Sequence, residues 1–176
     1  MTAPEPSAPP RRAVLAVGSN LGDRLDNLQG GIDALFDAPG FDFVAVSPVY
    51  QTVPVGGPDQ PDYLNAVIIV DTVLPARTIL HRAHGVEEAF ARVREQRWGP
   101  RTLDLDLIVC GAEISNDPEL TLPHPRAHER AFVLVPWHDI DPDAEIPGRG
   151  PVAELLSALD RDGVRRAAGS ELQPPA

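Results

Sequence analysis

Two apolar stripes with helical spacing place the strongest constraint on how this chain can fold. The positions are Leu21, Leu25, Leu28, Ile32 and Leu35 in the first stripe, and Ile79, Ala83, Val86, Phe90 and Val93 in the second. Steps of four and three residues keep each stripe on one face of a helix. The pattern therefore predicts two amphipathic helices, over 21–35 and 75–93, that need an apolar surface on which to pack.

Four apolar or alternating runs around these helices predict strands, at 13–17, 41–49, 64–70 and 103–110. The expected order is strand, helix, strand, strand, helix, strand. Two halves of this kind form an α+β sandwich, in which an antiparallel sheet carries both helices on one face. The segments that follow, including an amphipathic stretch over 152–159, predict C-terminal additions to this sandwich.

The length of 176 residues suits a single domain with its own core. A Pro-rich start predicts a disordered tail over 1–12, the domain is expected over 13–165, and a flexible tail is expected over 166–176. No apolar run approaches the ~20 residues that span a bilayer, and the start lacks the pattern of a secretory signal. The single cysteine, Cys110, fits a reducing, cytoplasmic compartment.

The charge balance excludes some classes of partner. The chain has 15 Lys plus Arg against 26 Asp plus Glu, a formal net charge of -11. Such a surface repels polyanions at long range, so neither nucleic acid nor an anionic membrane is expected as the main partner. A small anionic ligand is compatible with this charge where basic residues converge locally or a divalent cation assists.

The stretch RWGPRTLDLDLIVCG, residues 97–111, combines a strand pattern with two closely spaced carboxylates. Side chains alternate along a strand, so Asp104 and Asp106 share one face and the leucines share the other. Two carboxylates this close repel each other unless a cation lies between them, and Mg²⁺ accepts such ligands together with water and phosphate oxygens. The alternative is a solvated strand face whose aspartates pair with nearby arginines.

Basic residues gather on both sides of this acidic strand, although the chain as a whole is acidic. Four arginines fall within ten residues before it, and Arg126 and Arg130 follow in the turn-rich stretch after it. The planar guanidinium matches phosphate oxygens, which favours a phosphate-binding function for these arginines. The alternative for the first group is a helix end that favours cations, followed by a solvated loop.

The scarce aromatic residues adjoin loops rather than the periodic apolar faces. Tyr63, Trp98 and Phe132 could stack on a flat heterocycle, with the Asn65 amide recognising its edge, although ordinary core packing is the alternative for each. The i, i+4 spacing of two histidines in HPRAH resembles a zinc pair, but no third ligand is evident and the prolines disfavour a regular helix. A phosphate contact from His124 is the preferred interpretation.

Four collinear segments between residues 13 and 142 together resemble one enzyme family. They are AVGSNLGDR (16–24), SPVYQTVPVGGPDQPDYLNAV (47–67), RWGPRTLDLDLIVCG (97–111) and LPHPRAHERAFVLVP (122–136). These segments resemble the 6-hydroxymethyl-7,8-dihydropterin pyrophosphokinases of folate biosynthesis. The pairing of PDYLNA with RWGPRTLDLD is far more specific than a generic phosphate-binding motif.

The resemblance implies a fold, an activity and a set of ligands. The fold is a ferredoxin-like βαββαβ sandwich, and the chain is expected to be a monomer. The activity is transfer of diphosphate from ATP to the hydroxymethyl group of the pterin, with release of AMP. Two Mg²⁺ ions are expected with ATP, held by Asp104 and Asp106.

The resemblance also implies roles for individual residues. The implied catalytic residues are Arg92, Arg101, Asp104 and Asp106. The implied pterin contacts are Thr52, Val53, Pro54, Val55, Tyr63, Asn65, Trp98 and Phe132. The implied ATP contacts are His84, Glu87, Arg92, Arg94, Arg101, Thr121, His124 and Arg130. No side chain stands out as the general base, for which a metal-bound water or Asp106 is the candidate.

Two other classes of function use the same residues. A two-metal phosphohydrolase would release phosphate without the pterin, whereas a pyrophosphokinase should be nearly silent until its acceptor is present. A non-catalytic module that binds a small ligand would have no turnover to lose when the aspartates are replaced. The identity of the nucleotide product separates these alternatives.

Overall fold

A computed structural model describes residues 9–54, 59–91 and 102–176. The strands are β1 (Arg11–Ser19), β2 (Phe41–Val46), β3 (Tyr50–Thr52), β4 (Tyr63–Thr72), β5 (Asp104–Cys110), β6 (Ser115–Asp117), β7 (Leu120–Leu122), β8 (Glu145–Ile146), β9 (Gly150–Pro151) and β10 (Val164–Arg166). The helices are α1 (Arg24–Leu35), α2 (Ala76–Phe90), the 3₁₀ turn η2 (Ala127–Glu129), α3 (Ala131–Ile140) and α4 (Val152–Ser157).

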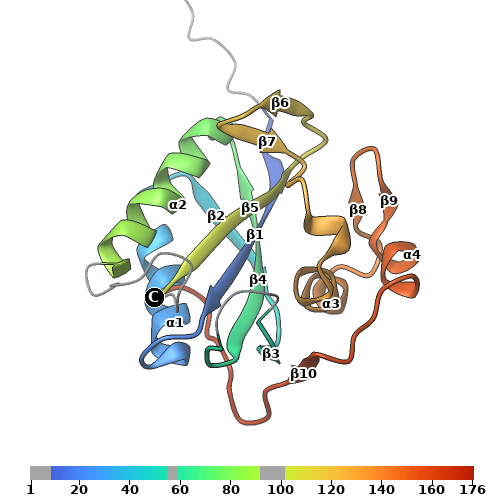
Figure 1. The fold of residues 1–176 in the computed structure, drawn as a ribbon. Coiled ribbons are helices and arrows are strands. Elements are labelled where there is room, and N and C mark those ends of the chain that lie inside the picture. The colour runs from blue at the N-terminus through green and yellow to red at the C-terminus, as the bar shows by residue number, and fades with distance from the viewer. Residues whose placement is uncertain (1–8, 55–58, 92–101) are drawn as a thin grey trace, which may run out of the picture.

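One six-stranded sheet organises the molecule, and its pairs are all antiparallel. Its strand order is β10-β3-β4-β1-β5, and β2 pairs with the far end of β4. Helices α1 and α2 lie on one face of the sheet, and α3 and α4 lie on the other (Figure 1). The mixed α and β architecture with an antiparallel sheet confirms that part of the sequence-based prediction.

Helices on both faces explain why the central strands are almost continuously apolar. Every residue of β1 from Ala13 to Ser19 is buried, as is every residue of β4 from Leu64 to Val70. The alternate positions divide between two cores, one under α1 and α2 and one under α3 and α4. A strand buried on both sides needs apolar side chains in both directions.

The two predicted helices form, with small differences at their ends. Helix α1 begins after Asp23, whose side chain accepts a hydrogen bond from the Asp26 backbone N–H at 3.1 Å. This N-cap starts the helix three residues later than the apolar stripe suggests. Helix α2 follows Pro75 and buries Ile79 and Ala83 against the sheet.

The predicted strand over 41–49 ends at Val46 as β2, and a separate strand, β3, begins at Tyr50; both pair with β4. Pro48 lies between them and has no backbone N–H for the ladder. Ser47 keeps this segment bonded to β4. Its backbone N–H donates to the Val67 carbonyl at 2.9 Å, and its hydroxyl accepts from the Val67 N–H at 2.8 Å. The result is a short strand, β3, that the sequence pattern did not predict as a separate element.

Strand β5 contains an irregularity that changes its pattern halfway along. Its register against β1 shifts at Val14, so that Val14 is opposite Val109 and Leu15 is opposite Leu107. Ile108 is the extra residue, and both Ile108 and Val109 join the core under α3. The strict alternation of aspartate and leucine therefore holds only in the first half of the strand.

The C-terminal residues lie against the domain, whereas the sequence predicts a flexible tail over 166–176. The Ala167 N–H donates to the Val49 carbonyl at 2.9 Å, and Leu172 is buried in the core under α1. Gln173 and Gln29 exchange hydrogen bonds through a side-chain amide and backbone groups. Apolar burial of Leu172 and these pairings hold the segment in place. Within the described residues, no helix is long and apolar enough to cross a membrane.

Candidate active site

A cavity of about 470 Å³ opens on the α3 face of the sheet, where β1 ends and β4 and β5 begin. We call it the aspartate cavity. Its lining residues are Ala16, Val17, Gly18, Thr52, Val53, Pro54, Tyr63, Asn65, Asp104, Asp106, Arg126, Glu129, Arg130, Ala131, Phe132, Asp160, Gly163 and Val164. The cavity thus gathers nine of the residues predicted for pterin, metal or nucleotide from segments that are far apart in the sequence.

Strand alternation aims both aspartates into this cavity. Leu103, Leu105 and Leu107 are buried in the core under α1 and α2, and Asp104 and Asp106 point from the opposite face. Both carboxylates are half-buried, and both stand opposite β1 positions without a large side chain. This placement agrees with the period-two pattern of the sequence.

Gly18 is the position on β1 that keeps the cavity open. It pairs with Asn65 on β4 and with Asp104 on β5, so it lies between the amide and the first carboxylate. A Cβ at this position would lie 2.5 Å from the Asn65 Oδ1 and 3.5 Å from the Tyr63 Cδ1. The missing side chain therefore makes room for the Asn65 amide, which could not keep its position beside a larger residue.

Two polar side chains form a fixed wall beside this space. The Asn65 Nδ2 donates to the Thr52 Oγ1 at 2.6 Å, and the residues are only 8% and 3% exposed. A buried amide held from one side presents its remaining groups in a defined direction, which suits recognition of a ligand edge. Tyr63 lines the cavity from the first position of β4, opposite Thr52.

Arg130 and Phe132 form the opposite wall, from the start of α3. The Arg130 guanidinium nitrogen Nη1 lies 3.9 Å from the Asp106 Oδ2. The same guanidinium lies over the Phe132 ring, with its carbon 5.6 Å from the ring centroid. The arginine thus connects the acidic strand to an aromatic surface within one cavity.

His124 lies beside this wall and is held as a neutral group. Burial lowers the pKa of His124; the Asp106 carboxylate opposes this effect, and the charges of Arg130 and Arg126 add to it. Its Nδ1 accepts a hydrogen bond from the Arg126 backbone N–H at 3.2 Å, which leaves the proton of the neutral ring on Nε2. The imidazole can therefore donate through Nε2.

The donor set of the cavity fits magnesium rather than a metal held by protein ligands alone. Among residues 9–54, 59–91 and 102–176, no group of three or more His, Cys, Asp or Glu side chains is arranged around a common point. The two half-buried carboxylates of Asp104 and Asp106 leave the rest of a coordination shell to water and phosphate oxygens. Mg²⁺ commonly binds in this way, through one or two carboxylates and the phosphates of a nucleotide.

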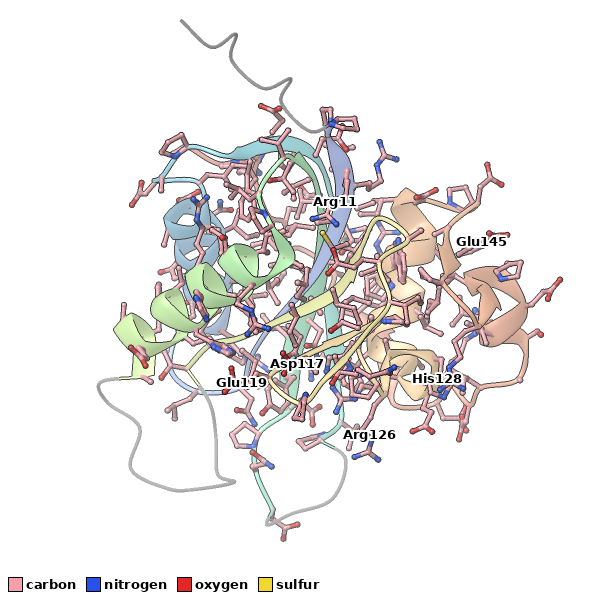
Figure 2. All side chains as sticks on the ribbon, turned by 90° about the horizontal axis from the view of Figure 1, so that it is seen from above. Arg11, Asp117, Glu119, Arg126, His128 and Glu145 are labelled. Atoms are coloured by element: carbon pink, nitrogen blue, oxygen red, sulfur yellow. The ribbon has the colours of Figure 1, made fainter. Side chains whose placement is uncertain are left out.

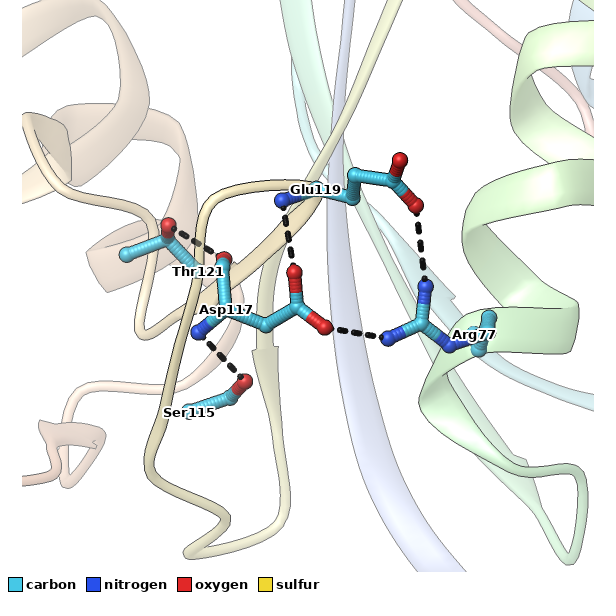
Figure 3. A network of polar contacts seen from close by, with 5 residues as sticks. All are labelled: Arg77, Ser115, Asp117, Glu119 and Thr121. Carbon is cyan, nitrogen blue, oxygen red and sulfur yellow. Dashed lines mark hydrogen bonds and ion pairs between the residues drawn. The ribbon is translucent and has the colours of Figure 1, made fainter.

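Four described residues predicted to contact ATP do not line this cavity: His124, which lies beside it, and three others that lie further away. His84 is exposed on α2, and Glu87 on the same helix accepts a hydrogen bond from the Leu105 N–H at 3.0 Å. The Thr121 hydroxyl donates to the Asp117 carbonyl at 3.1 Å within the β6–β7 hairpin (Figure 3). Glu87 therefore supports the strand that carries the aspartates.

The remaining predicted site residues fall outside the part of the chain that the structure describes. They are Val55, Arg92, Arg94, Trp98 and Arg101. Their proposed contacts with the pterin and with ATP stay predictions.

The cavity also includes residues that the sequence-based site did not contain. Arg126 precedes η2 and Glu129 is its last residue, and the Arg126 Nε lies 3.8 Å from the Glu129 Oε2. Figure 2 labels Arg126, which lies on the same side of the sheet as the C-terminal helices. Asp160 and Gly163 come from the turn before β10, and the Gly163 carbonyl accepts from the Val53 N–H at 3.1 Å. The polar, turn-rich sequence DRDG offered a turn signal but no indication of which cavity it would border.

The chain is similar to known proteins over most of its length. The family model described as 7,8-dihydro-6-hydroxymethylpterin-pyrophosphokinase (HPPK) matches residues 14–142. A Mycobacterium leprae protein named 2-amino-4-hydroxy-6-hydroxymethyldihydropteridine pyrophosphokinase is 50% identical over 171 residues, which cover 88% of this chain and 87% of that protein. A Pseudomonas aeruginosa protein of the same name is 39% identical over 160 residues, which cover 91% of this chain and 99% of that protein.

A solved structure of Plasmodium falciparum HPPK-DHPS resembles the fold with a TM-score of 0.66 at 13% sequence identity. The match covers 84% of this chain but only 43% of that longer chain, and at this identity it bears on the fold alone. The family resemblance and the pyrophosphokinase activity that were predicted from the sequence motifs are confirmed by the family model and the named relatives. The chain belongs to the 7,8-dihydro-6-hydroxymethylpterin-pyrophosphokinase family.

Proposed function

We propose that this chain transfers diphosphate from ATP to the hydroxymethyl group of 6-hydroxymethyl-7,8-dihydropterin in folate biosynthesis, with release of AMP. The observation that carries the proposal is the aspartate cavity, which combines two adjacent carboxylates with an amide, aromatic side chains and arginines. The carboxylates, through a metal ion, and the arginines can bind the phosphates of the donor. The amide and the aromatic side chains can bind a flat polar acceptor. Family membership supports the same reaction.

Asp104 and Asp106 would hold magnesium, and we propose two ions with ATP, as the resemblance to the pyrophosphokinase family implies. Bound magnesium would neutralise negative charge on the triphosphate and on the departing nucleotide. Arg130 supports the same task from the protein, since its guanidinium already lies 3.9 Å from Asp106. The implied catalytic residues Arg92 and Arg101 would add positive charge.

The acceptor would bind between the amide wall and the aromatic wall. Asn65 and Thr52 would hydrogen-bond the edge of the pterin, and Tyr63 and Phe132 would contact its faces. The further pterin contacts that we propose are Val53, Pro54, Val55 and Trp98. Enclosure by these groups would exclude water, so that transfer to the acceptor exceeds hydrolysis of ATP.

The nucleotide would bind on the side of Arg130 and His124. The neutral imidazole can donate its Nε2–H to a phosphate oxygen without bringing a charge that competes for Asp106. The further ATP contacts that we propose are His84, Glu87, Arg92, Arg94, Arg101 and Thr121. In-line phosphoryl transfer depends mainly on such positioning and charge neutralisation, because little covalent chemistry is required of the protein.

We also propose the ferredoxin-like arrangement, a monomer and a cytoplasmic location. The fold proposal is supported by the order β5-β1-β4-β3, in which each adjacent pair is antiparallel and both α1 and α2 cover one face. The cytoplasmic proposal is supported by a buried single cysteine, Cys110, and by the need for ATP.

The test is to identify the nucleotide product with pterin, ATP and Mg²⁺ present. AMP is expected, at a rate that depends on the pterin. Asp106→Asn should lower kcat/KM at least about a hundredfold, because a charge-stabilising group is lost from the transition state. Asp42→Asn is the matched control, since Asp42 is an exposed strand aspartate on β2, away from the cavity. ADP as the product, or phosphate release without pterin, would contradict the proposal.

A further inference from the structure

A second cavity, of about 360 Å³, opens on the other face of β3. We call it the arginine cavity. The residues that matter for its chemistry are Arg24, Gln51, Leu64, Arg165, Arg166 and Ser170. Three of its lining residues are arginines, and no aspartate or glutamate lines it among the described residues. This is a local reversal of sign on a chain whose net charge is -11.

Sheet register and helix α1 bring Arg165 and Arg24 to this face, whereas Arg166 is opposite Tyr50, whose hydroxyl reaches Asp139 on the α3 side. Arg165 on β10 is opposite Gln51 on β3, and Gln51 is opposite Leu64 on β4. Leu64 packs into the core on the α1 side, so these three positions share the face that carries α1. Arg24 reaches the same place as the first residue of α1. The neighbouring residue Thr52 points the opposite way, into the aspartate cavity.

These guanidinium groups differ from most other described arginines, which pair with carboxylates. The Arg11 Nη1 lies 2.6 Å from the Glu113 Oε1. The Arg77 Nη2 lies 2.7 Å from the Asp117 Oδ2, and Figure 3 shows this second pair. In the described part of the chain, Arg24 and Arg165 have no carboxylate oxygen within 4.0 Å. Two like charges that lack a direct ion pair favour binding of an external anion, and the nearby Asp62 carboxylate accepts from the Gln51 amide instead.

One of the arginines is already held in place by the backbone. The Arg24 Nη1 donates to the Asp62 carbonyl at 2.8 Å, and the Gln51 Nε2 donates to the Asp62 Oδ2 at 3.1 Å. These bonds order Arg24 and Gln51 before any ligand arrives. Ordering side chains in advance reduces the entropy that binding must overcome.

We propose that the arginine cavity binds a phosphate group, either as the free ion or as part of a small phosphate ester. The planar guanidinium forms paired hydrogen bonds with phosphate oxygens, and Ser170 adds a hydroxyl. A volume of about 360 Å³ exceeds the need of the ion alone and falls within the range of ~300–1,000 Å³ for small-molecule sites. Leu64 provides an apolar contact for the body of an ester.

The test measures binding to the whole chain without pterin, ATP or magnesium, in EDTA. No turnover occurs under these conditions, so the result does not depend on the proposed function. Because Arg126 and Arg130 line the aspartate cavity, the variants of Arg165 and Arg24 locate the binding. Inorganic phosphate and glucose 6-phosphate are titrated by calorimetry at constant ionic strength. Saturable binding is expected for the wild type. Arg165→Gln should raise the dissociation constant about tenfold or more, because a charge-assisted contact is lost.

Arg149→Gln is the matched control, because Arg149 is exposed in the turn between β8 and β9 and lines neither cavity. Arg24→Gln provides a second variant, and thermal unfolding of each variant verifies that it is folded. Tighter binding of the ester than of inorganic phosphate would identify an ester as the ligand, and equal binding would identify the free ion. Absence of saturable binding, or equal affinity in wild type, Arg165→Gln and Arg24→Gln, would overturn the proposal.

Discussion

The two cavities lie on opposite faces of strand β3 and differ in the charges that line them. Thr52 points into the aspartate cavity, and its neighbour Gln51 points into the arginine cavity. The arginine cavity has charges of one sign, whereas the aspartate cavity combines carboxylates with Arg126 and Arg130, and their other lining residues also differ. The aspartate cavity adds Asn65 and Phe132, whereas no aromatic residue lines the arginine cavity in the described part of the chain.

This difference indicates how much of a ligand each cavity can recognise. Charge alone attracts an ion of the right sign, and it selects weakly among ligands that carry the same group. A fixed amide and an aromatic face add direction and shape, which a flat substrate needs. The aspartate cavity therefore has the composition of a substrate site, and the arginine cavity has the composition of a site for one charged group.

The largest expected effect tests whether space is what makes the aspartate cavity a substrate site. Gly18→Ala places a Cβ 2.5 Å from the Asn65 Oδ1, so the amide must move and its bond to Thr52 is disturbed. We expect kcat/KM for the pterin to fall about a hundredfold, as displacements of about 1 Å can do. Steady-state kinetics with varied pterin concentration measure this change in kcat/KM.

Gly163→Ala is the matched control for this change. Gly163 lines the same cavity, but a Cβ there would meet the nearest atom, the Val53 Cβ, at 3.6 Å, which is ordinary contact. We expect kcat/KM to stay within about twofold of wild type. Equal losses in both variants would show that the space beside Gly18 has no special importance.

A smaller effect is expected from removing the amide that gives the aspartate cavity its direction. Asn65→Leu keeps a similar volume but leaves the Thr52 hydroxyl without its partner. We expect the KM for the pterin to rise about tenfold, the value of one buried hydrogen bond, with little change in the KM for ATP. The control is Gln51→Leu, which faces the other cavity. A parallel rise in both KM values would argue for general loss of structure.

The smallest effect is expected at Tyr50, the residue of β3 that lines neither the aspartate cavity nor the arginine cavity. The Tyr50 hydroxyl donates to the Asp139 Oδ2 on α3, and burial, followed by this hydrogen bond, raises the pKa of Tyr50 to about 12. Tyr50→Phe should lower the free energy of unfolding by about 1 kcal/mol at pH 7 and leave both affinities unchanged. Urea denaturation measures this difference.

The pH dependence of this difference follows from the raised pKa. The folded state favours the neutral phenol. The contribution of Tyr50 to the free energy of unfolding is therefore fully present below about pH 10, the ordinary pKa of tyrosine. It is lost as the pH rises from about 10 to about 12. Wild type and Tyr50→Phe should therefore converge in stability over this range, and a gap that widens would contradict the assignment.

Local periodicity was sufficient to predict much of the fold, because α1, α2, β1, β4 and β5 each have a repeating apolar pattern. Helix α3 has no such pattern, since AFVLVPWHDI is apolar on nearly all sides and contains Pro136. The docking of 167–176 also had no local signal. It depends on contacts between residues more than a hundred positions apart, such as Gln29 and Gln173.

The candidate site was predictable where one element or one motif defined it. Alternation alone indicated that Asp104 and Asp106 share a face. The positions of Tyr63 and Phe132 beside loops, with the Asn65 amide nearby, suggested a site for a flat ligand, and the resemblance identified that ligand as a pterin. Asp160 and Gly163 were not predictable, because they join the cavity only through the pairing of β10 with β3. Their sequence indicates a turn, and a turn can border any part of a molecule.

The extra residue in β5 has a consequence for how this protein can change over time. Ile108 shifts the phase of the strand between its two ends, so Asp104 and Asp106 and the apolar pair Ile108 and Val109 all lie on the α3 face. A strand without the shift would turn Val109 to the other side. Substitutions at Ile108 and Val109 therefore act on the core beneath α3, at the other end of the strand from the carboxylates that line the aspartate cavity.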